Sequence, residues 1–372
     1  MKISIVGAGN AGCLTALHYA YYSEAEVELK YDPSVLPEKV GQGTLLDAPT
    51  LLWLALGSDW YSNVIDATPK TGILYEGWGK VNEKFIHSFP LNSMALHYSP
   101  NKLQDTILSS GLFKVTEESI VNMDDVDSDY VFDCRGKPKS LDDYDELNSP
   151  VNAAILATKD EVDIQQYWTR SVATPDGWAF VIPNTTDTTS YGYIYNKDLS
   201  SKEEATKNFE TLFEVEAKDY LYFNNYVAKN PVANERVILN GNRLFFLEPL
   251  EASAIQSYSQ WLKNTYDVIF NGVLNWDDAS RLIKEYVHEI ENFILWHYQF
   301  GSKYDTAFWD YAKSFTISDK KFDDFLATGV SLSWPRVRNI YYDPNNPLSR
   351  YGQWLPWNFK NWHEGVTVSC VV

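Results

Sequence analysis

The sequence has 372 residues, of which 45% are hydrophobic and 22% charged, and its formal net charge is −19 at pH 7. This length and composition fit one large or two closely joined globular domains. The acidic balance argues against a nucleic-acid partner and against docking on anionic membranes. No apolar run is long enough to span a bilayer.

Cysteine and histidine usage bears on location and metal binding. Cys13, Cys134 and Cys370 are odd in number and widely spaced, and no HExxH or CxxC pattern occurs. The short apolar run at the N-terminus is interrupted by glycines and does not resemble a signal peptide. We therefore expect a cytoplasmic protein without a metal site.

The first twenty residues, MKISIVGAGNAGCLTALHYA, predict a strand, a tight turn and a helix. Gly7, Gly9 and Gly12 have the GxGxxG spacing of a dinucleotide-binding βαβ unit. The first glycine permits the turn and the second lets a pyrophosphate approach the backbone. The third lets the helix pack on the strand, and the free N–H groups of the helix face the phosphates. The sequence therefore predicts a nucleotide site here.

Residues 27–31 alternate as a second strand, at whose end an acidic residue is expected to hold a ribose hydroxyl. Asp32 is the candidate and Glu28 the alternative. A charged residue that merely opens a turn before Pro33 is an equally good interpretation.

A second glycine-rich turn, Gly41-Gln42-Gly43-Thr44, precedes an apolar helical stretch and again offers bare backbone N–H groups to a ligand. The segment 67–80 then reads as a strand and a turn with a lysine at each end, Lys70 and Lys80. Most lysines are solvated, so neither position alone indicates a site.

The rest of the chain predicts three regions. Residues 1–150 form the nucleotide-binding core, completed by parts of 235–265, and the acidic stretch 122–149 encloses a short strand at 130–133. Residues 151–235 form an antiparallel sheet with neighbouring strands at 178–182 and 191–195. Residues 266–372 form a helical cover, in which His297 shares a face with four apolar residues and is interpreted as a hydrogen-bonded core residue. The last forty residues read as irregular.

Several motifs, in order along the chain, resemble those of flavin-dependent halogenases of the tryptophan-halogenase type. Residues 177–183, GWAFVIP, resemble the GWxWxIP signature, and residues 246–251, FLEPLE, resemble the start of FLEPLEST. Lys70 lies in a segment like the one that carries the essential lysine of that family. The second glycine turn and residues 133–136, DCRG, resemble two flavin turns, and residues 292–298 and 305–309 resemble the helical tail. The matches are collinear from residue 3 to about residue 310.

The resemblance implies an α/β, Rossmann-type FAD-binding fold like that of flavin monooxygenases. It also implies that halide is oxidised to hypohalous acid with O₂ and reduced FAD, which a separate flavin reductase supplies in transient encounters. Lys70 takes the lysine role and Glu251 the role of the carboxylate that accepts the substrate proton. Backbone N–H groups of Ser253 and Ala254 would hold the halide, and Trp178, Phe180 and Pro183 would line the channel. The residues implied to bind flavin are Gly7, Gly9, Gly12, Asp32, Gly41, Gln42, Gly43 and Thr44.

The sequence also departs from the family pattern. Phe180 replaces the second Trp of the signature, Gln42 replaces an acid, and Ala254 replaces a glycine, whose loss limits backbone freedom. The acid at the end of the second strand aligns with Tyr31. The stretch before Phe246 is expected to lack the glycine-containing, small-residue segment of the flavin cradle. We therefore predict weak, dissociable FAD.

Two alternatives remain from the sequence. One is a flavin monooxygenase that hydroxylates an aromatic substrate, and the other is a non-catalytic relative that has lost its flavin. The substrate predicted for a halogenase is an electron-rich arene of the indole or phenol type. The chain has 13 Trp, 25 Tyr and 18 Phe, and composition alone favours an aromatic-rich core over an aromatic pocket as their explanation. The sequence does not choose between a monomer and a homo-oligomer.

Overall fold

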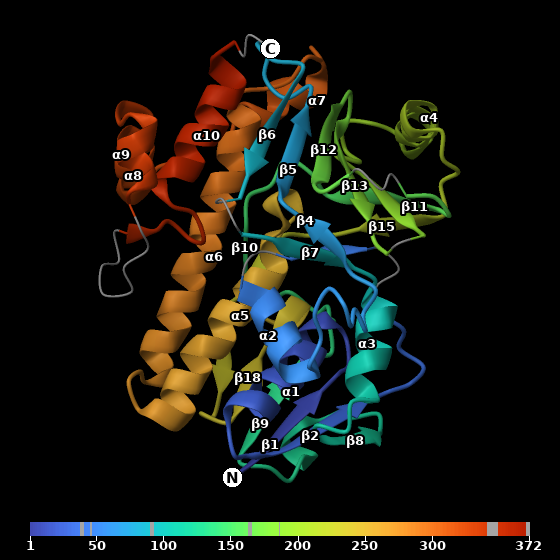
Figure 1. The fold of residues 1–372 in the computed structure, drawn as a ribbon, viewed down its shortest axis with the longest axis vertical. Coiled ribbons are helices and arrows are strands. Elements are labelled where there is room, and N and C mark those ends of the chain that lie inside the picture. The colour runs from blue at the N-terminus through green and yellow to red at the C-terminus, as the bar shows by residue number, and fades with distance from the viewer. Residues whose placement is uncertain are drawn as a thin grey trace.

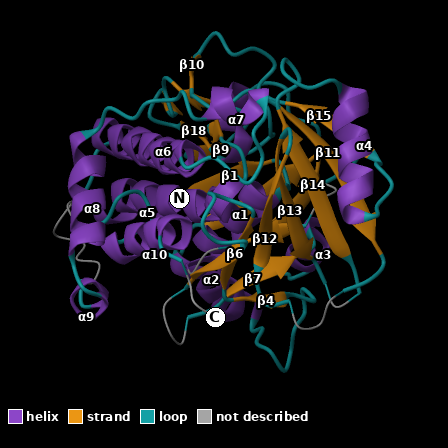
Figure 2. Cartoon of the chain, turned by 90° about the horizontal axis from the view of Figure 1, so that it is seen from above, coloured by secondary structure: helices purple, strands orange, loops and turns teal. Residues whose placement is uncertain are grey.

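The computed structural model describes residues 1–37, 41–44, 47–89, 93–162, 166–185, 187–340 and 349–369. A largely parallel sheet lies at the N-terminal end, a larger sheet lies above it, and helices of the C-terminal third run along one side of both (Figure 1). Seen from above, the larger sheet and these helices occupy opposite sides of the molecule (Figure 2).

The described residues of the first sheet have the strand order β17-β18-β9-β1-β2-β8. All its pairings are parallel except that of β17 with β18. Ile3 and Ile5 of β1 are buried together with Leu14 and Leu17 of helix α1, Asn10–Tyr22, so the predicted apolar faces meet. A Rossmann-type α/β fold is thereby confirmed. The strands are β1 Lys2–Val6, β2 Glu26–Tyr31, β8 Lys114–Glu117, β9 Tyr130–Asp133, β17 Val232–Ala233 and β18 Val237–Leu239.

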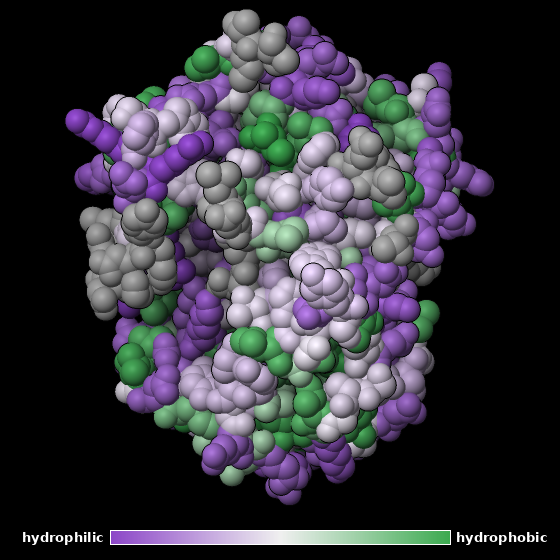
Figure 3. All heavy atoms as spheres, in the orientation of Figure 1, coloured by the Kyte–Doolittle hydropathy of each residue, from purple (hydrophilic) through white to green (hydrophobic). Residues whose placement is uncertain are grey.

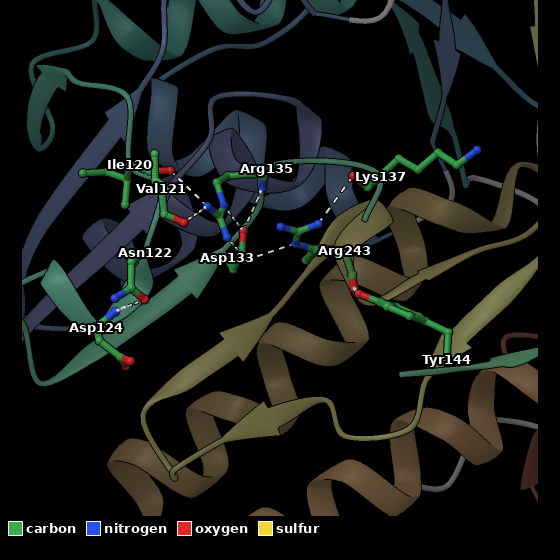
Figure 4. A network of polar contacts seen from close by, with 9 residues as sticks. All are labelled: Ile120, Val121, Asn122, Asp124, Asp133, Arg135, Lys137, Tyr144 and Arg243. Atoms are coloured by element: carbon green, nitrogen blue, oxygen red, sulfur yellow. Dashed lines mark hydrogen bonds and ion pairs between the residues drawn. The ribbon is translucent and has the colours of Figure 1, made fainter. Parts of the chain in front are cut away.

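Ion pairs fix the carboxyl end of β9, where Figure 4 shows them. The guanidinium of Arg135 donates to both carboxylate oxygens of Asp133 at 2.8 Å and to the carbonyls of Ile120 and Val121. Arg243 reaches the same carboxylate at 3.0 Å. The DCRG turn of the sequence is thus held beside the N-terminal glycine turn, because Val6 and Asp133 are register partners.

The larger sheet has the order β15-β11-β14-β13-β12-β5-β6, and its pairings are antiparallel except for β5 with β12. The two strands predicted at 178–182 and 191–195 are neighbours in it, as expected. β5 and β6 come from the predicted 1–150 region, so the sheet joins the two regions. Its strands are β5 Gly72–Glu76, β6 Lys84–Ser88, β11 Ala153–Lys159, β12 Thr169–Thr174, β13 Gly177–Pro183, β14 Thr189–Tyr195 and β15 Asp219–Tyr222.

Smaller sheets and helices surround these layers. Helix α4, Lys202–Phe213, packs Ala205 and Phe209 against the outer face of the larger sheet, and its other side is hydrophilic (Figure 3). The sheet β3-β7-β4 lies between the two large sheets (Figure 1), and β10-β16-β19 forms a further small sheet. These strands are β3 Gln42–Gly43, β4 Thr68–Lys70, β7 Ala95–Tyr98, β10 Tyr144–Glu146, β16 Tyr226–Ala228 and β19 Phe245–Phe246, and the nearby helices are α2 Asp47–Leu56 and α3 Pro100–Leu108.

The C-terminal third is helical, as predicted, and the expected face of α6, including His297, is buried. The irregular ending that we predicted is wrong. α10 starts with Pro356, a residue well suited to a first helical turn, and buries Phe359, Trp362 and Val366 at helical spacing. The helices are α5 Ser253–Tyr266, α6 Trp276–Gln299, α7 Ala307–Ala312, α8 Lys320–Ser331, α9 Trp334–Arg338 and α10 Pro356–Thr367. Among the described residues, no helix is both long and apolar enough to cross a membrane.

Candidate active site

Lys70, the last residue of β4 in the small sheet β3-β7-β4, is fully buried. Its Nζ donates to the backbone carbonyl of Thr44 at 3.2 Å. Burial lowers the pKa of Lys70 to about 7, although the charge of Glu251 raises it in part. Near neutral pH this amine therefore spends a large share of its time uncharged, which a solvated lysine does not.

The second glycine turn lies directly beside this lysine, because β3 and β4 both pair with β7. A Cβ built on Gly43 would lie 3.2 Å from Lys70 Nζ and 3.6 Å from Ala252 Cβ. Gly41 is equally confined, since its amide donates to Ser190 Oγ at 3.0 Å and a Cβ there would overlap the Asn184 side chain. The glycines of this turn thus let β3 fit between the lysine and the residues after Glu251.

Strand β13, which carries the GWAFVIP signature, contacts both the segment of Lys70 and the FLEPLE motif. The hydroxyl of Thr68 donates to the carbonyl of Pro183 at 2.6 Å, which fixes the end of β13 next to β4. Phe180 packs over Gly192, its register partner on β14, where a Cβ would overlap the ring. The indole N–H of Trp178 donates to Glu248 Oε2 at 3.0 Å. All three predicted channel residues belong to one buried strand.

Glu251 lies in a strained turn just before α5. Its φ is +67° and that of Ala252 is +53°, values that favour glycine, and α5 begins at Ser253 without a side-chain cap. The backbone N–H groups at this helix start, to which Ser253 and Ala254 belong, have no partner within the helix. The structure thus places the predicted halide residues at an uncapped helix N-terminus.

The carboxylate of Glu251 is buried and held by four side chains from separate segments of the chain. Its Oε1 accepts a hydrogen bond from Tyr75 and lies 2.9 Å from His87 Nδ1 and 3.1 Å from His297 Nε2. Its Oε2 accepts from Trp354 Nε1 at 3.3 Å. Burial alone would raise the pKa of Glu251, but the two histidines and their hydrogen bonds hold it well below its usual range.

Three of these four partners were missed by the sequence analysis. In β6 the buried and exposed positions alternate, which places Phe85 and His87 on the same inward face, and this alternation was a usable signal. Tyr75 and Trp354 carried no such signal, because only the folded chain brings them to Glu251. His297 is a hydrogen-bonded core histidine, as interpreted from its helical stripe, and its partner is Glu251.

A second buried carboxylate, Glu248, starts the same turn. It accepts from Tyr298 at 2.5 Å and from Ser149 at 2.7 Å, in addition to Trp178. Burial raises the pKa of Glu248 to about 7, and these hydrogen bonds oppose that rise. The side chain of Glu248 thus anchors the signature strand to α6.

The N-terminal glycine turn has the shape of a phosphate cradle. Gly7 has a φ of +107°, and a Cβ on it or on Gly12 would overlap backbone atoms, so both glycines are required by packing. A Cβ on Gly9 would meet nothing within 4 Å, and Gly9 caps α1 without a side-chain hydrogen bond. Open space in front of uncapped N–H groups is what the pyrophosphate of FAD requires, so these residues fit the cofactor.

The two acidic candidates for the ribose differ in the structure. Glu28 is buried in β2, and three lysines approach its carboxylate, the nearest being Lys114 at 2.9 Å. This carboxylate is therefore already used as an ion-pair partner. Asp32 follows the end of β2, where its carboxylate accepts from the amide and hydroxyl of Ser34. Of the two, Asp32 fits the ribose role better.

The glycine that we expected to be missing from the flavin cradle is present. Gly241 follows β18 with a φ of +64°, and a Cβ on it would lie 2.6 Å from Ala11 Cβ at the start of α1. The segment before Phe246 therefore does approach the N-terminal turn, and that expectation is wrong. The prediction of weak FAD binding loses this support and now rests on the remaining departures in the flavin turns, Gln42 and Tyr31.

The remaining candidates lie elsewhere. The side chain of Lys80 is 60% exposed and its Nζ pairs with Asp305 at 2.6 Å, so the structure brings Lys80 to no site. Cys13 and Cys134 are buried free thiols, and Cys370 lies outside the described residues. In the part of the chain that the structure describes, no group of three or more His, Cys, Asp or Glu could hold a metal ion.

Comparisons with known proteins bear on the family to which the chain belongs. The family model described as tryptophan halogenase matches residues 2–106 and 122–333. The tryptophan 6-halogenase ThaL of Streptomyces albogriseolus is 26% identical over 255 residues, which are 63% of this chain and 47% of that protein. The tryptophan 7-halogenase RebH of Lentzea aerocolonigenes is 25% identical over 58% of this chain and 44% of its own length. The match thus spans less than half the length of these curated relatives.

The fold has clear counterparts among solved structures. A tryptophan 6-halogenase from Streptomyces toxytricini superposes with a TM-score of 0.79 and 18% identity, covering 99% of this chain and 90% of that one. A flavin-dependent halogenase from Xanthomonas campestris gives a TM-score of 0.78 and 18% identity over 98% and 89% of the two chains. At this identity the likeness establishes the shared fold.

Proposed function

Because this chain belongs to the tryptophan halogenase family, we propose that it is a flavin-dependent halogenase acting on an electron-rich aromatic substrate. The observation that carries the proposal is the buried amine of Lys70, whose lowered pKa leaves a lone pair on nitrogen near neutral pH. Only an uncharged amine can attack the halogen of hypohalous acid. In that step the N–X bond forms, the O–X bond breaks, and the amine proton leaves with hydroxide as water.

The N-terminal turn and the second glycine turn would hold the cofactor. Gly7, Gly9 and Gly12 would cradle its pyrophosphate, Asp32 would bind its ribose, and the turn from Gly41 to Thr44 would lie at its ring. When bound, reduced FAD with O₂ supplies the oxidising power that turns halide into hypohalous acid. In this proposal a reductase delivers reduced FAD transiently in the cytoplasm, where the free thiols Cys13 and Cys134 persist.

The remaining residues would confine the oxidant. The start of α5, with the amides of Ser253 and Ala254, would hold the halide, since helix N-termini favour anions. Trp178, Phe180 and Pro183 would wall the route to Lys70 and exclude water. This confinement matters, because free hypohalous acid reacts without selectivity.

Glu251 would accept the proton of the arenium ion that forms when the halogen adds to the substrate ring. The C–H bond breaks, its electron pair restores the aromatic ring, and the proton goes to the carboxylate. Of the contacts from described residues, Glu251 Oε1 has three and Oε2 has one, with the indole of Trp354, so Oε2 is the oxygen with room for that proton.

The proposal is tested by supplying reduced FAD, O₂ and chloride, bromide or iodide with a panel of indoles and phenols, and identifying products by mass spectrometry. We expect a halogenated arene that depends on halide. Hydroxylated arene formed without halide would instead support a monooxygenase. Absence of any product, together with no change in melting temperature on adding FAD, would support a non-catalytic relative.

A further inference from the structure

Two histidines contact the same oxygen of Glu251, but their hydrogen bonds assign them different charges. Asn358 Oδ1 accepts from the amide of Leu355 at 2.9 Å, so its Nδ2 is the atom that donates to His87 Nε2 at 3.1 Å. His87 must therefore carry its single proton on Nδ1, from which it donates to Glu251. Its contacts are satisfied by the neutral imidazole, so His87 lowers the pKa of Glu251 as a hydrogen-bond donor and not through the charge that a second ring proton would add.

In His297, by contrast, neither ring nitrogen faces a hydrogen-bond donor of any described residue from which it could accept. Its Nδ1 lies 2.6 Å from the carbonyl oxygen of Phe293, which can only accept, so Nδ1 carries a proton. Its Nε2 lies 3.1 Å from Glu251 Oε1, and a second proton must lie between these two atoms because two lone pairs would repel. Glu251 and His297 therefore share one proton between Oε1 and Nε2, and with the proton on Nδ1 the pair has no net charge.

The surroundings favour an imidazolium at His297 with an ionised Glu251. Tyr75 and Trp354 donate to the carboxylate, which stabilises its charged form. The ring of Trp362 lies with its centroid 4.2 Å from that of His297 and crosses it at 63°, and aromatic rings attract cations. Burial outweighs the bond to Glu251 and the charge of that carboxylate, so the pKa of His297 lies below its usual value. The second proton is therefore assigned from the contacts of the two ring nitrogens and not from this shift.

This pairing has a consequence for Lys70. Besides its hydrogen bond to Thr44, Lys70 Nζ lies 5.6 Å from the centre of the Phe89 ring. On the neighbouring strand β7, the titratable group that interacts with Lys70 is His97. Burial holds the pKa of His97 well below its usual range, so this ring is neutral. Lys70 lies close to the turn of Glu251, since a Cβ on Gly43 would be 3.2 Å from Lys70 Nζ and 3.6 Å from Ala252 Cβ. Within the described ranges, Glu251 is then the charge that acts on the lysine, and a carboxylate without a cation of its own would draw a proton onto Lys70.

We propose that His297 is a positioning residue that offsets the charge of Glu251 and thereby keeps Lys70 a neutral amine. This inference rests on the proposed function, in which the neutral amine receives the halogen. It assigns His87, the other histidine on the same oxygen, the role of a neutral donor.

The test is the titration midpoint of Lys70, followed by the NMR signal of its Cε in lysine-labelled protein and assigned by its loss in Lys70→Met. His297→Gln is expected to raise the midpoint by about one pH unit or more, a tenfold change in proton affinity. His87→Gln is expected to change it less. The matched control is His288→Gln, because His288 lies on the same helix and pairs with Glu291 at 2.9 Å, away from Lys70.

A double variant separates charge from packing. In a Glu251→Gln background there is no carboxylate to offset, so adding His297→Gln is expected to leave the Lys70 midpoint unchanged. If His297→Gln does not fold, the ring nitrogens of His297 in histidine-labelled wild type decide. A proton on or shared by Nε2 at pH 7 supports the inference, and a bare Nε2 overturns it.

An unchanged Lys70 midpoint in folded His297→Gln would also overturn the inference. These titrations need no flavin, halide or substrate. Failure of this inference is therefore distinguishable from failure of the halogenase proposal, which is judged by products alone.

Discussion

Burial, rather than residue type, distinguishes Lys70 from Lys80, which lies on the same segment of chain. The first ends a strand inside the protein and the second pairs with Asp305 at the surface. The family motif singles out Lys70 from the sequence. The shift of its pKa depends on how completely other segments bury the amine, and one sequence does not specify that burial. The same holds for Glu251, whose position is readable in the FLEPLE motif and whose four donors are not.

The pKa of Lys70 gives a pH dependence with a definite sign. The reacting form is the neutral amine, so halogenation is expected to rise with pH through about 7 and to level off above it. The measurement is kcat/KM for the aromatic substrate between pH 6 and pH 9. A rate that is already at its plateau at pH 6, or that falls across pH 7, would contradict a neutral-amine role.

Glu248 predicts a pH dependence of stability. Its pKa is about 7 in the folded chain and 4.5 in its ordinary state, so the folded protein holds this proton more tightly. The resulting stability is present below pH 4.5 and is lost as pH rises through 7. From pH 4.5 to 8, wild type is expected to lose up to about 3 kcal/mol relative to Glu248→Gln, which has no proton to lose. Denaturant unfolding of both proteins across this range is the check, and parallel curves would contradict it.

At the scale of elements, the predicted strands and helices of the N-terminal unit and of the larger sheet are present, because their apolar periods are regular. Prediction did worst in the last forty residues, where proline and tryptophan were taken as signs of irregular chain. Proline is suited to the first turn of a helix, and Phe359, Trp362 and Val366 do recur at helical spacing. The segment before Phe246 was misjudged similarly, because Gly241 lies at the end of a strand and not beside the motif.

The N-terminal turn offers a matched pair of variants. Gly9→Ala adds a Cβ in open space, so the protein is expected to keep its melting temperature and to lose FAD affinity by about tenfold or more. Gly12→Ala would place a Cβ 1.8 Å from the carbonyl of Gly7, so it is expected to reduce folded yield. Calorimetric titration with FAD, alongside thermal unfolding, separates the two effects. Unchanged FAD affinity in Gly9→Ala would remove this turn from the cofactor site.

At the scale of the whole molecule, the candidate site depends on contacts between segments that are distant in sequence. β5 and β6 leave the N-terminal region to join the larger sheet, and they carry Tyr75 and His87 to Glu251. α6 and the segment before α10 bring His297 and Trp354 to the same carboxylate. Motif order predicted the family and the two central residues. A single sequence does not show which distant segments contact one another, so the side chains that surround Glu251 could not be predicted.

The most direct test of the central claim compares wild type with Lys70→Met under identical supply of reduced FAD, O₂ and bromide. One assay measures hypobromous acid with a scavenger that needs no enzyme, and the other measures brominated arene. We predict that the variant still produces hypobromous acid while its bromination of the arene falls by about 100-fold or more. Bromination of the arene by Lys70→Met at the wild-type rate, in the same position of the ring, would contradict the account.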